Sequence, residues 1–322
     1  MARILTGVQS TGTPHLGNIL GAVIPAIELS KSSKNESFFF IADMHSLTQI
    51  KNGEILRKNT INTAAVWLAC GIDTNKSVFY KQSDIPEVTE LAWYLNCYFP
   101  YQRLTLAHSF KDKSKNLKDI NSGLFTYPLL MAADILLYDA DIVPVGKDQL
   151  QHIEITRDLA IKFNKHNGET FVIPSSMTNN QTEYIPGTDG KKMSKSKNNT
   201  IDIFLDEKSL RKQIMKIKTD SIPVEEPKNH KTCTVFKLFS LISKSSEIEE
   251  MKKNYINGGL GYGDAKQLLF EKVLKFFKAH REKYNYLQNN PNLVISELEK
   301  GSIKAKETAK TTIKKVRNKI GF

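Results

Sequence analysis

Short β-branched or aromatic runs alternate with longer amphipathic stretches through the first two thirds of the 322-residue chain, and this alternation restricts the fold more than any other feature. The short runs are expected strands, and the stretches between them, with apolar residues three and four apart, are expected helices. The expected strands cover residues 3–8, 37–43, 77–82 and 140–146, and the expected helices cover 16–31, 53–70, 86–97 and 123–138. This order predicts a Rossmann-like α/β domain with a doubly wound, mostly parallel sheet, whose ligands bind at the carboxyl ends of the strands.

The last third of the chain differs in both pattern and charge. From about residue 206 onward the pattern is nearly all helical, which predicts a second, smaller, all-helical domain. Residues 1–207 carry 21 Lys and Arg against 22 Asp and Glu, whereas residues 208–322 carry 25 against 12. Clustered cations gain affinity for polyanions through the release of phosphate counterions, so a nucleic acid partner is one interpretation and a solvated lysine-rich surface is the other.

Composition excludes several classes of protein. No apolar run approaches the roughly 20 residues of a spanning helix, and the N-terminus lacks the apolar region of a signal peptide, so we expect a cytoplasmic protein without a membrane segment. Cys70, Cys97 and Cys233 are far apart and form no C-x-x-C pair. They predict neither a disulfide framework nor a zinc site, and we expect three buried thiols.

The stretch "TGVQSTGTPHLGN", residues 6–18, lies between the first expected strand and the first expected helix. A helix N-terminus offers unpaired N–H groups and a positive dipole end to an anion, and small residues allow a nucleotide to approach the backbone. Neither common phosphate-binding glycine motif is present, so a purely structural turn remains an alternative.

A second stretch, "TDGKKMSKSKNN" at residues 188–199, combines lysines with serines and has almost no apolar residues. It predicts a flexible basic loop suited to gripping a phosphate chain transiently. A solvated loop between two domains is the alternative.

Both stretches carry a resemblance to a known family. "HLGN" at 15–18 resembles the first signature of the class I aminoacyl-tRNA synthetases, and "KMSKS" at 192–196 is identical to their second. Within that family the chain resembles the tryptophan-specific bacterial members over its whole length, most specifically at residues 123–160 and in "DMHSLT" from Asp43. It differs at Ser10, where proline is usual, and at His15, where threonine is frequent.

The resemblance implies a two-step reaction. L-tryptophan would be activated by ATP to the adenylate with release of pyrophosphate, and the aminoacyl group would then move to the 3′ end of tRNA(Trp). Because the attacking carboxylate is already ionised, catalysis would consist of positioning and charge stabilisation, with Mg²⁺ held by the ATP phosphates and no metal site on the protein. The implied partners are tRNA(Trp), L-tryptophan and a second copy of the chain in a homodimer.

The resemblance also assigns the ATP site to the two signatures, to the turn before the first, and to the segment after the fourth strand. The implied catalytic residues are His15, Asn18, Lys113, Lys192 and Lys195. The implied ATP-binding residues are Gln9, Ser10, Thr11, Gly17, Asn18, Gly146, Lys147, Asp148, Ile185, Lys192, Met193, Ser194, Lys195 and Ser196. Gly17 would leave room for the ribose and adenine. For the polar side chains near the helix start, a cap or turn hydrogen bond is the alternative role, and Lys113 could instead belong to a solvated loop.

The amino-acid pocket is predicted partly from spacing. Tyr127, Met131 and Asp134 are four and three residues apart and share one face of a helix. A carboxylate on an apolar face needs a donor, and the indole N–H of tryptophan is a donor only. A surface position or an internal salt bridge is the alternative for Asp134. The resemblance adds Val143, Val145, Gln149, His45 and Gly7 to this pocket, with Gln149 on the ammonium group.

For the domains we expect residues 1–188 to form the catalytic domain, joined by a C-terminal helix at 291–322. Residues 189–290 would supply the KMSKS loop and a helical anticodon-binding domain. The final stretch from Lys300 carries eight cations and one acid, and it either binds tRNA or packs against the catalytic domain. A tyrosine-specific synthetase, another adenylate-forming transferase and an inactive RNA-binding relative remain as alternatives.

Overall fold

The computed structural model describes residues 1–106, 120–178 and 184–322. Its sheet is parallel throughout and has the order β3-β2-β1-β4-β5. The strands are β1 (Ala2–Gln9), β2 (Asn35–Ala42), β3 (Ser77–Lys81), β4 (Ile142–Pro144) and β5 (Ser175–Met177). The chain steps outward from β1 to β3 and then returns to the other side of β1, so a crevice opens between the carboxyl ends of β1 and β4.

The predicted doubly wound fold is confirmed, and the first four strands lie where they were expected. The fifth strand was not expected. β5 has the sequence Ser-Ser-Met and all three residues are exposed, so it carries none of the apolar alternation by which a strand is recognised.

Helices cover both faces of the sheet because successive strand residues point to opposite sides. Phe39 and Ile41 of β2 pack with α2 (Ile24–Ser30) and α4 (Gly53–Ala69). Phe38 and Phe40 pack on the opposite face in one core with three helices. These are α5 (Glu87–Tyr98), α8 (Ser122–Leu136) and α9 (Leu150–Asn167).

Short helical segments follow the carboxyl ends of the strands and bring polar residues to the same edge of the sheet. After β1 come α1 (Leu16–Asn18) and a π-helical segment, η1 (Ile19–Val23), which leads into α2, so the helix expected at 16–31 is built from three pieces. The other segments at this edge are α3 (Asp43–Ser46) after β2, η2 (Gln82–Asp84) after β3 and η3 (Lys147–Gln149) after β4. A short α6 (Tyr101–Thr105) follows α5.

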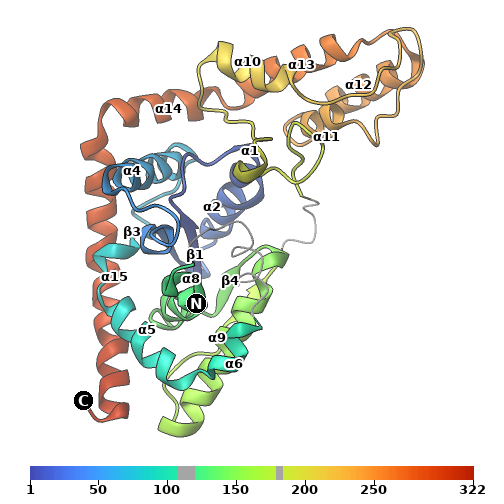
Figure 1. Cartoon of the computed structure of the whole chain (residues 1–322). Helices are drawn as coiled ribbons and strands as arrows, with labels where there is room; N and C mark the ends of the chain where they lie inside the picture. The colour runs from blue at the N-terminus through green and yellow to red at the C-terminus, as the bar shows by residue number, and fades with distance from the viewer. Residues whose placement is uncertain (107–119, 179–183) are drawn as a thin grey trace.

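The remaining helices project from the α/β part and then return to it (Figure 1). The projecting helices are α10 (Glu207–Met215), α11 (Thr234–Ser240), α12 (Ser245–Asn257) and α13 (Tyr262–Phe276). Helix α14 (Lys278–Asn289) turns back over α4, and α15 (Pro291–Ile320) runs down the side of the sheet.

Helix α15 protects the edge strand β3. A Cβ on Gly301 would lie 1.8 Å from the carbonyl oxygen of Phe79, so only glycine allows the helix to approach the strand backbone this closely. Below this point Ala305, Ala309 and Ile313 are buried in the core. The thin apolar stripe of the last helix therefore packs against the α/β part, and an exposed strand edge is avoided.

Two further predictions concern the three cysteines and membrane-spanning helices. Cys70 and Cys233 are buried as expected, but the prediction was wrong for Cys97, which is exposed on α5. The buried face of α5 is the one whose apolar residues recur at three and four spacing, Val88, Leu91, Ala92 and Leu95, and Cys97 lies off that face. Within the described ranges, none of the helices combines the length and the apolar character needed to span a bilayer.

Candidate active site

The turn after β1 places two signature residues at a helix start. The Nδ1 atom of His15 accepts the backbone N–H of Asn18 at 3.2 Å, and the side-chain oxygen of Asn18 accepts the backbone N–H of His15 at 3.2 Å. This reciprocal capping box is the local role considered as an alternative for both residues. It leaves the Nε2 side of His15 as the part of the ring that can serve a ligand.

The protonation state of His15 follows from its surroundings. Burial, together with the positive charge of Lys195, lowers the pKa of His15 to about 4. The ring is therefore neutral near pH 7, and because Nδ1 accepts a hydrogen bond, the proton lies on Nε2. His15 thus offers one N–H donor at the edge of the site without adding a positive charge.

The KMSKS loop touches this turn. Met193 is buried, and its Sδ atom lies 3.3 Å from the backbone nitrogen of Gly17. A Cβ placed on Gly17 would lie 3.2 Å from the Cβ of Met193. The same Cβ would lie 3.0 Å from the Nδ1 atom of His15. A side chain at Gly17 would press on both residues, so its absence allows the two signatures to meet, and making room for ATP stays the predicted role of Gly17.

Lys195 approaches the same turn from the other side. Its ammonium nitrogen lies 3.2 Å from where a Cβ of Gly12 would be, and Gly12 has a φ of +117°, which favours glycine. Asp202 faces this lysine: burial raises the pKa of Asp202, and the charges of Lys195 and Arg281 partly offset that effect. Gly12 therefore lets a cation lie directly on the turn after β1, within the electrostatic reach of a carboxylate.

Asn199 fixes the shape of the loop. It is buried, its side-chain oxygen accepts the backbone N–H of Ser194 at 2.7 Å, and its amide nitrogen donates to Asp189 at 2.7 Å and to the carbonyl of Lys192 at 3.1 Å. Ile185 is also buried, and its carbonyl accepts the backbone N–H of Met193 at 3.0 Å. The Ser194 and Ser196 hydroxyls bond to each other at 2.8 Å.

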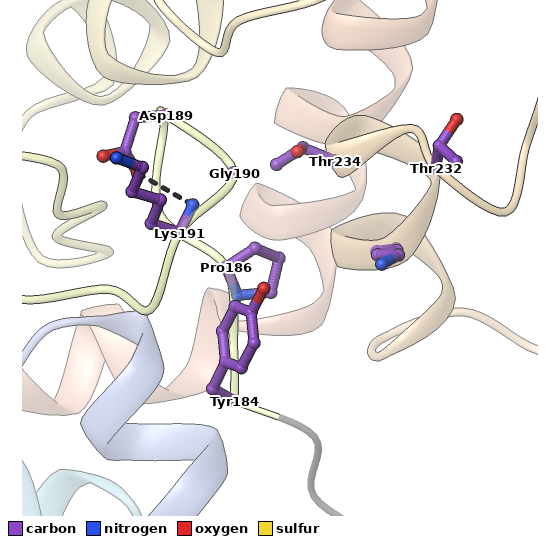
Figure 2. A pocket seen from close by; sticks show the side chains of 8 residues that line it. Tyr184, Pro186, Asp189, Gly190, Lys191, Thr232 and Thr234 are labelled. Atoms are coloured by element: carbon purple, nitrogen blue, oxygen red, sulfur yellow. Dashed lines mark hydrogen bonds between the residues drawn. The ribbon is translucent and has the colours of Figure 1, made fainter.

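A polar hollow of about 310 Å³ lies between this loop and α11, as Figure 2 shows. Gly190 and Lys191 of the loop line one side, and Thr234 and Lys237 of α11 line the other. Its described lining includes none of the residues predicted for catalysis. The hollow therefore separates the outer side of the loop from the helical part of the chain.

The segment after β4 reaches the loop across the crevice. Lys192 and Asp148 form an ion pair at 3.6 Å, with their side chains 62% and 61% exposed. Gly146 and Lys147 are exposed beside them, and the Gln149 amide bonds to Asp148 at 3.2 Å. The end of β4 and the KMSKS loop are thus brought to one place, as the prediction of a shared ATP site requires.

Ser10 occupies a different position from its neighbours in the turn. Its hydroxyl is fully buried and lies 3.2 Å from both the Ser46 and Thr60 hydroxyls. Its side chain therefore anchors the turn to α3 and α4, whereas Gln9 and Thr11 are partly exposed. Lys113 lies outside the described residues.

On the opposite face of the sheet edge, Asp134 is buried in a polar network. His45 Nε2 lies 2.9 Å from one carboxylate oxygen, and the Gln82 amide nitrogen lies 2.9 Å from both. Burial raises the pKa of Asp134, and the hydrogen bonds from His45 and Gln82 oppose that rise. The carboxylate is thus held internally, as one alternative supposed, and yet it has about four acceptor positions, so the network leaves room for one further donor.

The other residues predicted for this pocket lie on the same side of the sheet as Asp134. Tyr127 and Asp134 are both buried on α8, and Met131 between them is partly buried. The Tyr127 hydroxyl lies 2.5 Å from His152 Nε2, which fixes the ring. Val143 is buried on β4 and Val145 follows it half-buried.

Gly7 forms an opening in the sheet. It is exposed although β1 is a central strand, and the ring of Phe40 lies 2.3 Å from where its Cβ would be. Leu5, two residues earlier, points into the core that contains α8, so Gly7 is on the Asp134 side of the sheet. Because Gly7 has no side chain, it leaves space on the side of the sheet where Asp134 lies.

Sequence reasoning missed Gln82, Asn199 and Asp202. Gln82 is the last residue of the third expected strand, at the carboxyl edge of the sheet, so its position alone was a usable signal. Asn199 and Asp202 follow the lysine loop and give no pattern of their own. Among the described residues, no group of three or more His, Cys, Asp or Glu side chains is arranged to hold a metal ion.

Comparison with known proteins agrees with this geometry. The family model "tRNA synthetases class I (W and Y)" matches residues 1–278. Tryptophan–tRNA ligases from Campylobacter jejuni and Rhodopirellula baltica are each 46% identical over 320 residues, which is 99% of this chain and 100% and 99% of theirs. The crystal structure of the Campylobacter jejuni tryptophanyl-tRNA synthetase complexed with ADP and tryptophan has a TM-score of 0.94 at 47% identity and covers 99% of this chain and 100% of that one.

Proposed function

The chain belongs to the class I tRNA synthetases that comprise the tryptophan and tyrosine enzymes, and from this premise we propose how its residues act as a tryptophan–tRNA ligase. The enzyme activates L-tryptophan with ATP and transfers it to tRNA. The observation that carries the proposal is the contact between the two signatures, in which Met193 lies on Gly17 and Lys195 lies on Gly12. This contact forms one basic site from segments far apart in the sequence, at the switch point of the sheet.

In the first step the tryptophan carboxylate attacks the α-phosphate of ATP. The bond from that phosphorus to the bridging oxygen breaks, and pyrophosphate leaves with the electron pair. Lys192 and Lys195 stabilise the charge that grows on pyrophosphate, and His15 donates its Nε2–H to a phosphate oxygen. The remaining ATP residues of the two signatures and of the β4 end hold the adenosine.

In the second step a ribose hydroxyl of the terminal tRNA adenosine attacks the carbonyl carbon of the adenylate, and AMP leaves. The helical part of the chain, residues 189–290, binds the tRNA in this proposal, and residues 1–188 with the helix from 291 carry out the chemistry. Residues 189–290 carry 21 Lys and Arg against 13 Asp and Glu, and this excess of positive charge supports the division, because tRNA is a polyanion.

Specificity for tryptophan is assigned to Asp134, whose carboxylate accepts the indole N–H. Tyr127, Met131, Val143 and Val145 surround the ring, and Gln149 and His45 complete the polar wall. A phenylalanine side chain would leave this acceptor without a donor, and a tyrosine hydroxyl, which both donates and accepts, would partner it less well than the donor-only indole N–H; the loss is roughly 1 to 3 kcal/mol.

Mg²⁺ would enter with ATP. Phosphate oxygens and water are the ligands that this ion usually keeps when it is bound with a nucleotide. When bound it would add positive charge to the triphosphate, and the lysines of the loop would act on the same oxygens.

A homodimer in the cytoplasm is the proposed form of the enzyme. Trp93, Tyr101 and Leu106 on and beside α5 and α6 are 69%, 66% and 61% exposed. Large aromatic side chains at the surface are enriched in protein interfaces. Their position supports a subunit interface on this side of the catalytic domain.

ATP–pyrophosphate exchange with each of the twenty amino acids tests the proposal. Exchange that depends on tryptophan alone, followed by charging of tRNA(Trp), is the expected result. Exchange with tyrosine would identify the other specificity of the family, exchange with no amino acid but with another acid would indicate a different adenylate-forming enzyme, and no exchange at all would indicate an inactive relative.

A further inference from the structure

Gln82 lies directly after β3, in η2, and none of its surface is exposed. Its side chain lies between two segments of the tryptophan pocket, α3 with His45 and α8 with Asp134. A buried amide has two donors and an acceptor to satisfy, so its partners determine what it does there.

The partners of Gln82 determine the orientation of its amide. The Oε1 atom accepts the backbone N–H of His45 at 3.4 Å, and a backbone N–H can only donate. The NH₂ group must therefore face Asp134, where Nε2 lies 2.9 Å from both Oδ1 and Oδ2. Gln82 thus presents donors, and never an acceptor, to the carboxylate.

Asp134 depends on these donors. Within the part of the chain that the structure describes, no lysine or arginine forms an ion pair with it, and its other hydrogen bond comes from His45 Nε2 at 2.9 Å. The remaining titratable groups that face it are Tyr80 and Tyr138, whose pKa values burial raises further above neutrality, so both stay uncharged. The donors from Gln82 and His45 keep this buried carboxylate ionised and correctly turned.

We propose that Gln82 is a positioning residue that determines specificity for the indole N–H: by donating to both oxygens of Asp134 it keeps that carboxylate an acceptor aimed at the substrate. The inference rests on the proposed function, since it concerns the same pocket. It adds a residue that touches Asp134 instead of the substrate. If Asp134 loses this support, it takes up a proton or turns away, and an amino acid with an N–H is no longer favoured over one without it.

The test compares tryptophan with its benzothiophene analogue, in which sulfur replaces the indole N–H. The kcat and KM for each amino acid are measured by ATP–pyrophosphate exchange in the wild type, in Gln82→Met and in Ser83→Ala. Ser83 is the matched control because it is the next residue and its hydrogen bonds go to Asp43 instead of Asp134. Methionine keeps the length of the side chain but has no N–H donor.

In Gln82→Met we expect the preference for tryptophan over the sulfur analogue to fall about 10- to 100-fold, the range for a hydrogen bond to a charged group. The fall should come from a higher KM for tryptophan, with the KM for ATP close to that of the wild type. Ser83→Ala should keep the wild-type preference. An unchanged preference in Gln82→Met, with both amino acids weakened equally, would mean that Gln82 only fills space and would overturn the proposal.

A second variant keeps the test decisive if Gln82→Met does not fold. In Gln82→Glu two buried carboxyl groups share one proton, so one pKa is raised strongly. Below that pKa the introduced carboxylic acid donates to Asp134 and the preference for tryptophan is kept; above it the preference is lost. A preference in Gln82→Glu that follows pH as the wild type does would overturn the proposal. A wild type without tryptophan-dependent exchange would instead reject the proposed function itself.

Discussion

Lys192 and Asp148 pair across the ATP half of the site with side chains 62% and 61% exposed, whereas His45 and Asp134 pair in the tryptophan half with side chains 6% and 2% exposed. The first pair joins two segments from opposite sides of the crevice. The second is part of a network within one core. The same kind of contact therefore has different consequences in the two halves.

An exposed ion pair contributes little, about 0 to 1 kcal/mol, so Lys192 can exchange Asp148 for a phosphate at low cost. A buried network in a low dielectric is strong when satisfied and costly when broken. The ATP half is thus suited to charge stabilisation that develops during the reaction. The tryptophan half is suited to discrimination, because its acceptor is fixed before the substrate arrives.

The largest expected effect is in the ATP half. Lys195→Ala should lower kcat for adenylate formation by about 100- to 1000-fold, the range for loss of one preorganised stabilising group, with a smaller change in the KM for ATP. Pre-steady-state measurement of adenylate formation checks this. A normal kcat would show that the loop and the turn do not act on one transition state.

Gly17→Ala extends this test to the contact between the signatures. Its new methyl group would press on His15 and Met193, so the loop should be displaced from the turn. Both substitutions then act on one unit. The double variant with Lys195→Ala should therefore lose less transition-state stabilisation than the two single variants lose in sum. Strict additivity would separate the two segments.

The next effect is in the tryptophan half. Asp134→Asn should raise the KM for tryptophan about 5- to 100-fold, because the amide has no charge and presents its NH₂ group to the indole N–H in one orientation. Exchange assays with tryptophan and tyrosine measure the loss of selectivity. An unchanged KM and selectivity would remove Asp134 from the pocket.

A smaller effect concerns stability at acidic pH and tests the neutral state of His15. Its folded pKa of about 4 lies below its ordinary value of 6.5, so the unfolded chain takes up the proton first. Stability is therefore complete above about pH 6.5 and falls as the pH drops toward 4. His15→Asn keeps a capping side chain but does not titrate. Between pH 7 and pH 5 its free energy of unfolding should therefore fall by about 2 kcal/mol less than that of the wild type. Urea unfolding at the two pH values decides, and equal losses would mean that His15 is not held neutral.

The smallest expected effect lies outside both halves. Lys304, Lys310 and Lys314 are exposed on α15, opposite its buried stripe. Reversing their charges should weaken tRNA binding several-fold and leave tryptophan activation unchanged. The slope of the logarithm of the binding constant against the logarithm of the salt concentration should become less steep by about one for each lost phosphate contact. Filter binding across a salt series measures this. Loss of exchange activity would show that the outer face of α15 also supports the catalytic domain, and unchanged binding would place the tRNA elsewhere.

Much of the fold was predictable because strong periodicity marks it. The alternation of strands and helices predicted the doubly wound sheet, which is confirmed, and the place of the first signature after the first strand predicted a ligand site there. The exposed strand β5 and the π-helical segment after Asn18 carried no comparable pattern. Their conformations depend on neighbours that are distant in the sequence.

The sequence by itself determined which residue types could do the chemistry: lysines for a leaving pyrophosphate, a carboxylate for an indole N–H, and glycines where backbones must approach. Only the tertiary structure decided their partners. Met193 reaches Gly17 across 176 positions, and Gln82 reaches Asp134 across 52. Local spacing fixes which residues share a helix face or follow a strand, but contacts of this separation depend on how the sheet orders its strands and on where the chain returns. The sequence therefore identified the acceptor and the cations, and the fold decided what holds each of them in place.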